Sequence, residues 1–252
     1  MRQYFSVASR RARGHPLPVL LIRAQCPAKP PLHPALALTP CLLSHGYPDR
    51  GIKSHAQVAA FDDFILELLE RKEKMVYLFL ADGFEETEAF VPYDILKRGG
   101  IDVVKVGVTG EYVTGSHGIT VKTDALIDDI DESCDMAILP GGMPGTENLD
   151  KCDKVKAVVR KAFIEGKYVA AICAAPMVLG KLGILNGKMA TCFPGFEEYL
   201  FGAEHVHSFC VRSGNVVTAC GAGAAFQFGF TLLSLFDKEK SEEVKRSMQY
   251  VL

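Results

Sequence analysis

The chain of 252 residues lacks several patterns that mark whole classes of protein. It contains no Trp, and no uncharged apolar run comes near the roughly 20 residues that a membrane-spanning helix needs, so no membrane partner is expected. Its eight cysteines include no CxxC pair and no zinc-ligand spacing, so no metal site is expected. We interpret them as reduced thiols, which are typical of a cytoplasmic protein.

Nucleotide-binding motifs are also missing. No GxGxxG sequence follows the first predicted strand, which argues against a dinucleotide cofactor, and no P-loop is present. The sequence therefore offers no recognisable site for a nucleotide cofactor.

Acidic residues are absent from positions 1–48, which instead hold eight of the 13 prolines. Eleven of the 28 Lys and Arg but only six of the 30 Asp and Glu lie within residues 1–74, so this part is positively charged and residues 75–252 are negatively charged. Because an acidic domain repels phosphates, no nucleic-acid binding is expected. We therefore divide the chain into a leader, residues 1–74, and a domain, residues 75–252.

The leader allows three interpretations. Its arginines and its lack of acids are typical of a cleaved targeting peptide, although the prolines would interrupt an amphipathic helix. The same composition suits a disordered tail. Alternatively, the leader is not part of the mature protein and translation starts at Met75. We favour this last interpretation, because residues 70–74 can all be encoded by purine-only codons, as a ribosome-binding site would be.

Apolar strand patterns and helix patterns alternate after Met75. The predicted strands cover residues 75–80, 101–108, 135–139, 169–172, 188–192 and 216–219. The predicted helices cover residues 85–98, 154–165, 176–180, 224–236 and 241–250, and residues 111–123 form a hairpin. This alternation predicts a doubly wound, mostly parallel sheet between two layers of helices, which is a three-layer, flavodoxin-like α/β sandwich.

A cysteine stands where one predicted strand becomes a helix. Cys173 lies within the segment 169–176, whose small residues, including Ala174, suit the crowded turn of a nucleophile elbow. Backbone N–H groups and the helix dipole at this point would lower a thiol pKa. The alternative is a packed core cysteine, since free cysteines are often buried.

Two other motifs also follow predicted strands. Glu88 comes after the first strand, and Gly141 and Gly142 come after the third, where their flexible backbone could direct amides at a small anion. Ligands of such sheets bind beyond the carboxyl ends of the strands, so these residues could converge with Cys173 in one crevice. Glu88 alone could equally be a solvated carboxylate at the start of a helix.

Together these motifs resemble the DJ-one/ThiJ/PfpI superfamily, in particular the branch of the Parkinson-disease-associated protein deglycase and its bacterial relatives. The matching segments are 83–88, 139–142, 170–176 and 221–223. Their order and spacing extend through residues 75–250, whereas residues 1–74 have no counterpart. The resemblance implies a class I glutamine amidotransferase-like fold, Cys173 as the reactive cysteine, Glu88 as its acid partner, and Gly141, Gly142 and Ala174 as the substrate or anion site.

The resemblance also implies an activity. A thiolate and a carboxylate in one pocket repel each other, so we expect Glu88 to be protonated and to donate to the Cys173 thiolate. This chemistry suits a cofactor-independent enzyme acting on reactive dicarbonyls such as methylglyoxal, of the glyoxalase III or protein deglycase type. Its partners would be a small-molecule aldehyde or a glycated substrate, and a second copy in a homodimer. The alternative is a redox sensor or chaperone whose cysteine is oxidised without turnover.

Some positions depart from the family pattern. Hydrolytic branches place a His directly after the cysteine, where this chain has Ala174, so a cysteine hydrolase is disfavoured. A more distant His of the family falls at Gly202. His205 and His207 are close by, and each is either a substitute or an exposed loop residue.

Two basic positions also bear on the expected site. An arginine that lines the anion pocket in relatives is replaced by His117, which would make substrate binding responsive to pH. Arg98 matches another basic position of the family. Both are candidates for an auxiliary role in binding.

Overall fold

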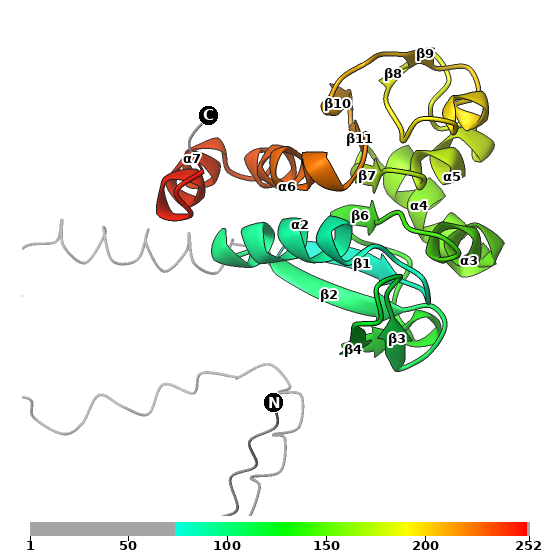
Figure 1. Cartoon of the computed structure of the whole chain (residues 1–252), viewed down its shortest axis with the longest axis horizontal. Coiled ribbons are helices and arrows are strands. Elements are labelled where there is room, and N and C mark those ends of the chain that lie inside the picture. Colours follow the sequence, from blue (N-terminus) through cyan, green and yellow to red (C-terminus); the bar gives the residue numbers. More distant parts are fainter. Residues whose placement is uncertain (1–73, 251–252) are drawn as a thin grey trace, which may run out of the picture. The chain divides into compact units, whose positions relative to one another are not determined.

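A seven-stranded sheet forms the centre of the computed structural model, which describes residues 74–250 (Figure 1). The strand order is β10-β11-β7-β6-β1-β2-β5, and only the β10–β11 pair is antiparallel. Its strands are β1 (Met75–Leu80), β2 (Asp102–Gly107), β5 (Ala125–Leu126), β6 (Met136–Leu139), β7 (Tyr168–Ile172), β10 (Cys210–Ser213) and β11 (Val216–Ala219). The predicted mostly parallel, flavodoxin-like fold is confirmed, whereas the predictions for the leader lie outside the described residues.

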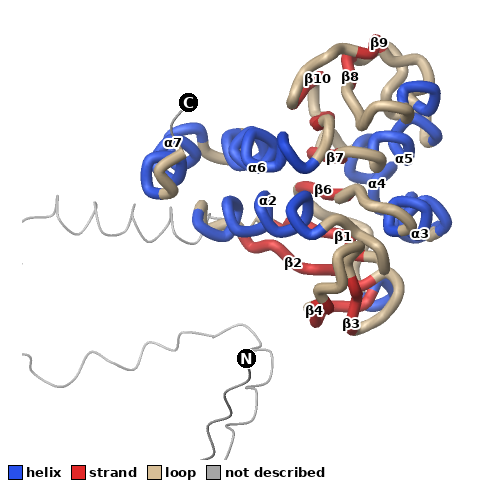
Figure 2. Tube along the Cα trace, in the orientation of Figure 1, coloured by secondary structure: helices blue, strands red, loops and turns tan. Residues whose placement is uncertain are grey.

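Helices cover both faces of this sheet (Figure 2). They are α2 (Glu86–Arg98), α3 (Gly145–Lys151), α4 (Asp153–Ile164), α5 (Pro176–Lys181), α6 (Ala225–Ser234) and α7 (Lys238–Ser247), with short 3-10 turns η1 (Ile127–Asp129), η2 (Glu197–Tyr199) and η3 (Ala222–Ala224). Helices α2 and α6 pack together over one face, and α3, α4 and α5 pack over the other. Within residues 74–250, each helix is too short or too polar to span a bilayer.

The position of strand β1 in the sheet explains why its sequence is apolar throughout. Val76, Leu78 and Leu80 pack into the core cluster beneath α2 and α6, while Tyr77 and Phe79 pack into the cluster beneath α4 and α5. Successive side chains of a strand point to opposite faces, so a strand covered by helices on both sides needs an apolar residue at every position.

Helix α2 begins and ends as its sequence predicts. The Glu85 side chain caps the helix by accepting a hydrogen bond from the Glu88 backbone N–H at 2.7 Å, and Gly99 ends it. A Cβ atom at Gly99 would lie 2.8 Å from Leu233 Cδ2, so the glycine also allows the close approach of α6. The capped first turn holds Glu88 at the carboxyl end of β1.

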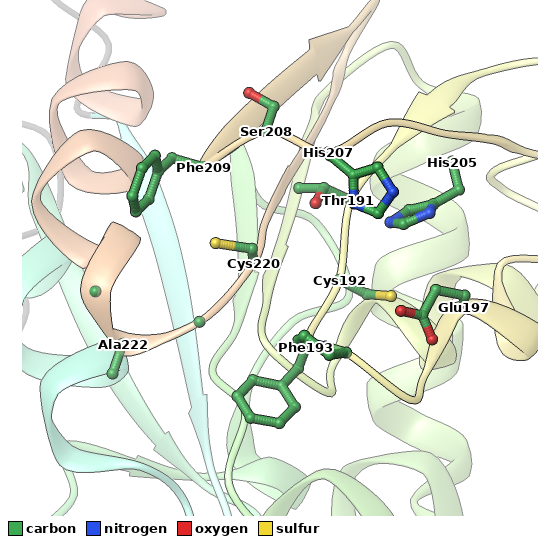
Figure 3. A pocket seen from close by; sticks show the side chains of 13 residues that line it. Thr191, Cys192, Phe193, Glu197, His205, His207, Ser208, Phe209, Cys220 and Ala222 are labelled. Atoms are coloured by element: carbon green, nitrogen blue, oxygen red, sulfur yellow. The ribbon is translucent and has the colours of Figure 1, made fainter.

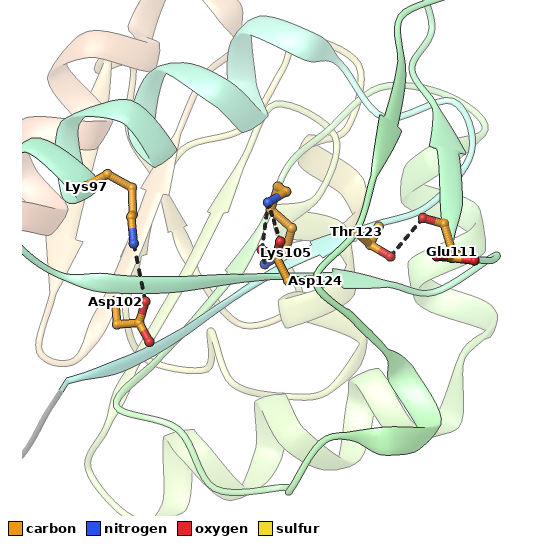
Figure 4. A network of polar contacts seen from close by, with 6 residues as sticks. All are labelled: Lys97, Asp102, Lys105, Glu111, Thr123 and Asp124. Carbon is orange, nitrogen blue, oxygen red and sulfur yellow. Dashed lines mark hydrogen bonds and ion pairs between the residues drawn. The ribbon is translucent and has the colours of Figure 1, made fainter. Parts of the chain in front are cut away.

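The hairpin of β3 (Tyr112–Thr114) and β4 (Thr120–Lys122) forms where the sequence predicts it. Polar contacts tie its neighbourhood to β2, as Figure 4 shows. Lys105 Nζ lies 2.7 Å from Asp124 Oδ2, and Thr123 Oγ1 donates to the Glu111 carbonyl oxygen at 3.0 Å. These contacts hold the hairpin at one edge of the sheet.

The segment after α5 differs from the prediction. The strand expected at 188–192 is shorter, because only β8 (Met189–Ala190) is extended, and it pairs with β9 (Glu204–His205) in a separate two-stranded sheet. Strand β10 was not predicted, since its four residues alternate weakly and its pairing depends on β11.

Candidate active site

Cys173 directly follows β7 and precedes α5, which is the strand–cysteine–helix order that the sequence predicts. Its φ angle is 65°, a left-handed conformation that is strained for any residue with a side chain. Two backbone hydrogen bonds hold it: its N–H donates to the Ala219 carbonyl at 2.9 Å, and its carbonyl accepts from the Phe193 N–H at 2.8 Å. The side chain thus projects from a fixed turn at the carboxyl edge of the sheet.

Glu88 is buried, with 1% of its surface exposed, and is therefore not a solvated carboxylate at a helix start. Its Oε2 atom accepts a hydrogen bond from the Gly141 N–H at 2.9 Å, and its carboxyl group also bonds to the Cys173 side chain and to the backbone of Ala222. Burial raises the pKa of Glu88 to about 7, against the lowering effect of these hydrogen bonds. A carboxyl group with this pKa can both donate and accept a proton near neutral pH.

The loop after β6 is shaped around this pair. A Cβ atom at Gly141 would lie 2.6 Å from both Cys173 Cβ and Glu88 Oε2, so no larger residue fits. Gly142 has a φ angle of 87°, and its backbone, like that of Ala174, bonds to the Cys173 side chain in a way that lowers the thiol pKa. Within this loop, Gly141 therefore bonds to the Glu88 carboxyl group and Gly142 bonds to the Cys173 sulfur.

The pKa of the Cys173 thiol nevertheless moves upward. Burial raises it, and the neighbouring Glu88 carboxylate raises it further. The backbone of Ala174 and Gly142 lowers the thiol pKa, as expected for this turn, but burial and the neighbouring carboxylate outweigh that effect. Cys173 and Glu88 titrate as a pair, and when Glu88 holds the proton it no longer repels a thiolate and can donate to it.

His117 lies in the β3–β4 turn and binds Glu86 instead of the Cys173–Glu88 pair. Its Nδ1 atom is 2.8 Å from Glu86 Oε2, its backbone N–H donates to Glu86 Oε1 at 2.8 Å, and its side chain is 70% exposed. The bond to Glu86 raises the pKa of His117. His117 thus joins the hairpin to α2, and its auxiliary role in anion binding stays a prediction.

Arg98 is also distant from Cys173 and Glu88 of the same chain. It stands ten residues after Glu88 on the same helix, which corresponds to about 15 Å along the axis. Its Nε atom lies 2.7 Å from Asp94 Oδ2 in an exposed ion pair. Within a single chain, Arg98 therefore cannot assist Cys173.

His205 and His207 line a cavity of about 620 Å³, as Figure 3 shows. Their ring centroids are 4.8 Å apart. The other lining residues include Thr191, Cys192, Phe193, Pro194, Glu197, Ser208, Phe209, Cys220, Gly221, Ala222 and Gly223. Cys173 is outside this lining but is joined to it through the Phe193 backbone.

Sequence reasoning did not identify the phenylalanines or Cys220 of this cavity. Cys220 follows β11 at the same carboxyl edge as Cys173, and that position after a predicted strand was the available signal. Gly202 is outside the lining, and a Cβ atom there would lie 2.5 Å from the Asn186 side chain.

A group of three side chains could offer ligand atoms to a metal ion. Atoms of Glu85, Glu86 and His117 all lie within 4.8 Å of one another among the residues that the structure describes. The hydrogen bonds between Glu86 and His117 already occupy these atoms, so the group is explained as a structural contact.

Comparison with known proteins shows which family this chain belongs to. Residues 74–235 match the DJ-1/PfpI family. The chain is 38% identical over 205 residues to Protein DJ-1 homolog B of Arabidopsis thaliana, covering 79% of this chain but only 46% of that longer protein. It is 37% identical over 149 residues to Deglycase PH1704 of Pyrococcus horikoshii, covering 58% of this chain and 89% of that protein.

A solved structure, Toxoplasma gondii DJ-1 in an oxidized form, shares the fold with a TM-score of 0.68 and 32% sequence identity. The similarity covers 71% of this chain and the whole of that one. Since the family match extends over most of the described residues and the fold is that of DJ-1, this chain belongs to the DJ-1/PfpI family.

Proposed function

We propose that the protein is a cysteine-dependent, cofactor-independent enzyme that converts reactive dicarbonyls such as methylglyoxal, free or as adducts on other molecules, into 2-hydroxy acids. One observation carries this proposal: Glu88 is buried against Cys173 and has a pKa of about 7. Such an acid can supply a proton in one step and take one up in the next. The deglycase name of the Pyrococcus horikoshii relative is in keeping with this chemistry.

The first step is addition of the Cys173 sulfur to the aldehyde carbon. In the proposed active form the proton is on Glu88 and the negative charge is on the sulfur, whereas the pKa shifts of the resting pair favour ionisation of Glu88 before Cys173. As the carbon–sulfur bond forms, the aldehyde oxygen takes the Glu88 proton, which gives a hemithioacetal and leaves Glu88 as a carboxylate. The strained turn at Cys173 presents the sulfur at the edge of the sheet, where an aldehyde can reach it.

The second step moves a proton between neighbouring carbons. The Glu88 carboxylate removes the proton from the former aldehyde carbon and returns it to the former ketone carbon. The hydroxyl proton on the former aldehyde oxygen passes to the former ketone oxygen, and the product is a thioester of a 2-hydroxy acid. Water then hydrolyses the thioester and restores the Cys173 thiol. Amides of Gly142 and Ala174, which already bond to the sulfur, are placed to stabilise negative charge during these steps.

The proposal is tested by measuring D-lactate formation from methylglyoxal with the full chain. Cys173→Ala should abolish it, whereas Cys152→Ser should leave it unchanged, because Cys152 ends helix α3 and takes no part in the steps above. Lactate formation that survives in Cys173→Ala, or its absence in the wild-type protein, would contradict the proposal.

A second candidate function is redox sensing by the same residue. Cys173 is half-buried beside a carboxyl group that can carry a proton, and a protonated carboxyl can stabilise an oxidised sulfur by hydrogen bonding. Stoichiometric oxidation of Cys173 without any turnover of aldehydes would favour this candidate. We also propose a homodimer, which light scattering would detect as twice the chain mass.

A further inference from the structure

Cys220 is the neighbour of Cys173 across the sheet. Strands β7 and β11 are parallel and their last residues, Ile172 and Ala219, are paired, so the two cysteines directly follow paired strand ends. The Cys173 N–H still donates to the Ala219 carbonyl at 2.9 Å, so the strands stay adjacent at this point. Neighbouring strands lie about 4.8 Å apart, which is within the range of Cα separations that a disulfide spans.

The two side chains also pack against the same part of the core. Both are half-buried against the core cluster that contains Ile172, Ala219 and Phe228. Cys220 in addition lines the cavity of about 620 Å³, so small molecules can reach this side of the pair (Figure 3).

The other cysteines near Cys220 are less well placed to react with Cys173. Cys210 is on β10, one strand further from Cys173, and its sulfur contacts Thr231 Oγ1 at 3.7 Å. Cys192 is only 3% exposed, and Figure 3 shows its sulfur directed toward Glu197, away from Cys220. Of Cys192, Cys210 and Cys220, only Cys220 follows a strand that pairs with β7.

We propose that Cys220 is a resolving thiol, which captures Cys173 after oxidation by a peroxide and closes an intramolecular Cys173–Cys220 disulfide. In the first step the Cys173 thiolate attacks one oxygen of hydrogen peroxide, the O–O bond breaks, and the departing hydroxide takes the Glu88 proton to form water. Cys173 is then a sulfenic acid, and Glu88 is a carboxylate.

In the second step the Cys220 thiol transfers its proton to the Glu88 carboxylate, and its sulfur attacks the Cys173 sulfur. The S–O bond breaks, and the hydroxide that leaves takes the proton from Glu88 as water. The sum is the oxidation of two thiols to one disulfide and the reduction of one peroxide to two waters. Burial is the main cause of the raised pKa of the Cys220 thiol, and the charge of Glu88 raises this pKa further. Glu88 is therefore close to Cys220.

This bond would change how the protein responds to peroxide. A disulfide can be reduced by other thiols, whereas further oxidation of Cys173 to the sulfinic acid is irreversible for most proteins. Because it consumes the Cys173 sulfur, the disulfide would also stop aldehyde chemistry until it is reduced. Cys220 would thus make the site reversibly sensitive to peroxide.

Tryptic digestion of the full chain separates the relevant cysteines cleanly. Peptide 168–181 contains only Cys173, peptide 213–238 contains only Cys220, and peptide 189–212 contains both Cys192 and Cys210. The reduced protein is treated with about one equivalent of hydrogen peroxide, its remaining thiols are alkylated, and the unreduced digest is analysed by mass spectrometry. We expect peptides 168–181 and 213–238 to be joined with the loss of two hydrogens. On non-reducing denaturing electrophoresis the protein should migrate as a single chain, because the disulfide is intramolecular.

Two variants make the test specific. Cys220→Ser should abolish the link, and its Cys173 should gain two oxygens at a lower peroxide dose than in the wild type. Cys210→Ser should keep the link. A link from 168–181 to 189–212, a link between two chains, or equal sulfinic acid formation in wild type and Cys220→Ser would overturn the proposal. No aldehyde is present, so the outcome is independent of the proposed enzymatic function.

Discussion

Glu88 Oε2 accepts a hydrogen bond from the Gly141 N–H at 2.9 Å, and this contact fixes the carboxyl group against Cys173. It joins the first turn of α2 to the loop after β6, two segments that are far apart in the sequence. The proximity of Glu88 to the thiol therefore depends on a glycine as much as on either reacting residue.

Gly141→Ala should disable the site, because its Cβ atom would lie 2.6 Å from both Cys173 Cβ and Glu88 Oε2. We expect dicarbonyl turnover to fall by about 100-fold or more, since a positioned acid or base contributes on that scale. We also expect a loss of about 1–3 kcal/mol in the free energy of unfolding, as for other overpacked sites. Gly110→Ala is the matched control, because its nearest contact would be at 3.8 Å. Equal losses in both variants would contradict this explanation.

Substitution of Glu88 reveals which partner holds the proton. If Glu88 donates to the Cys173 thiolate, Glu88→Ala should raise the thiol pKa by removing a donor, and Glu88→Gln should raise it less because an amide can still donate. Thiolate stabilisation should fall more in Glu88→Ala than in Glu88→Gln, by about 1–3 kcal/mol, the contribution of a hydrogen bond to a charged group. Thiolate absorbance measured against pH in the three proteins reports these values. A lower thiol pKa in Glu88→Ala would mean that Glu88 is ionised beside the thiol.

Burial of Glu88 should make stability depend on pH. Its pKa is raised from 4.5 to about 7, so between these values the folded state binds more protons than the unfolded state. The free energy of unfolding should therefore decrease as pH rises from 4.5 to 7, by up to about 3 kcal/mol. Urea unfolding at a series of pH values would show this decrease in the wild type and its loss in Glu88→Gln. Parallel curves for the two proteins would count against a buried, neutral Glu88.

The contact between His117 and Glu86 should stabilise the β3–β4 hairpin mainly at lower pH. Glu86 raises the pKa of His117, so the contribution is fully present below the ordinary histidine pKa and is lost as pH rises through the raised value. Amide hydrogen exchange in residues 112–122, after correction for the intrinsic effect of pH, should be slower in the wild type than in His117→Gln at low pH. The two should converge at high pH, and Cys173 reactivity should not change.

Much of the fold could be predicted because it depends on local patterns. The apolar run of β1 and the capped start and glycine end of α2 are signals within a few neighbouring residues. Strand β10 gave no such signal, because its pairing is decided by β11 and its own residues are only partly buried. The segment at 188–192 has strand-like residues, but only Met189–Ala190 forms a strand, which pairs outside the main sheet.

The candidate site was predicted less completely than the fold. Cys173 lies at the strand–helix turn, and Glu88 and Gly141 lie beside it, as strand ends in such sheets suggest. His117 and Arg98 were matched by sequence position alone, but the structure gives them Glu86 and Asp94 as partners. Sequence position does not specify which acid a surface base will meet after folding.

Local sequence patterns were enough to predict most of the strands and helices, the turn at Cys173 and the small residues that the turn requires. These features depend on backbone preferences and on the period of apolar residues, which act over a few positions. Two features became clear from the packing of the whole domain: β11 lies beside β7, which brings Cys220 next to Cys173, and Glu88 is buried. The reason is that burial and proton affinity depend on which distant segments pack together and exclude water, and no local pattern carries that information.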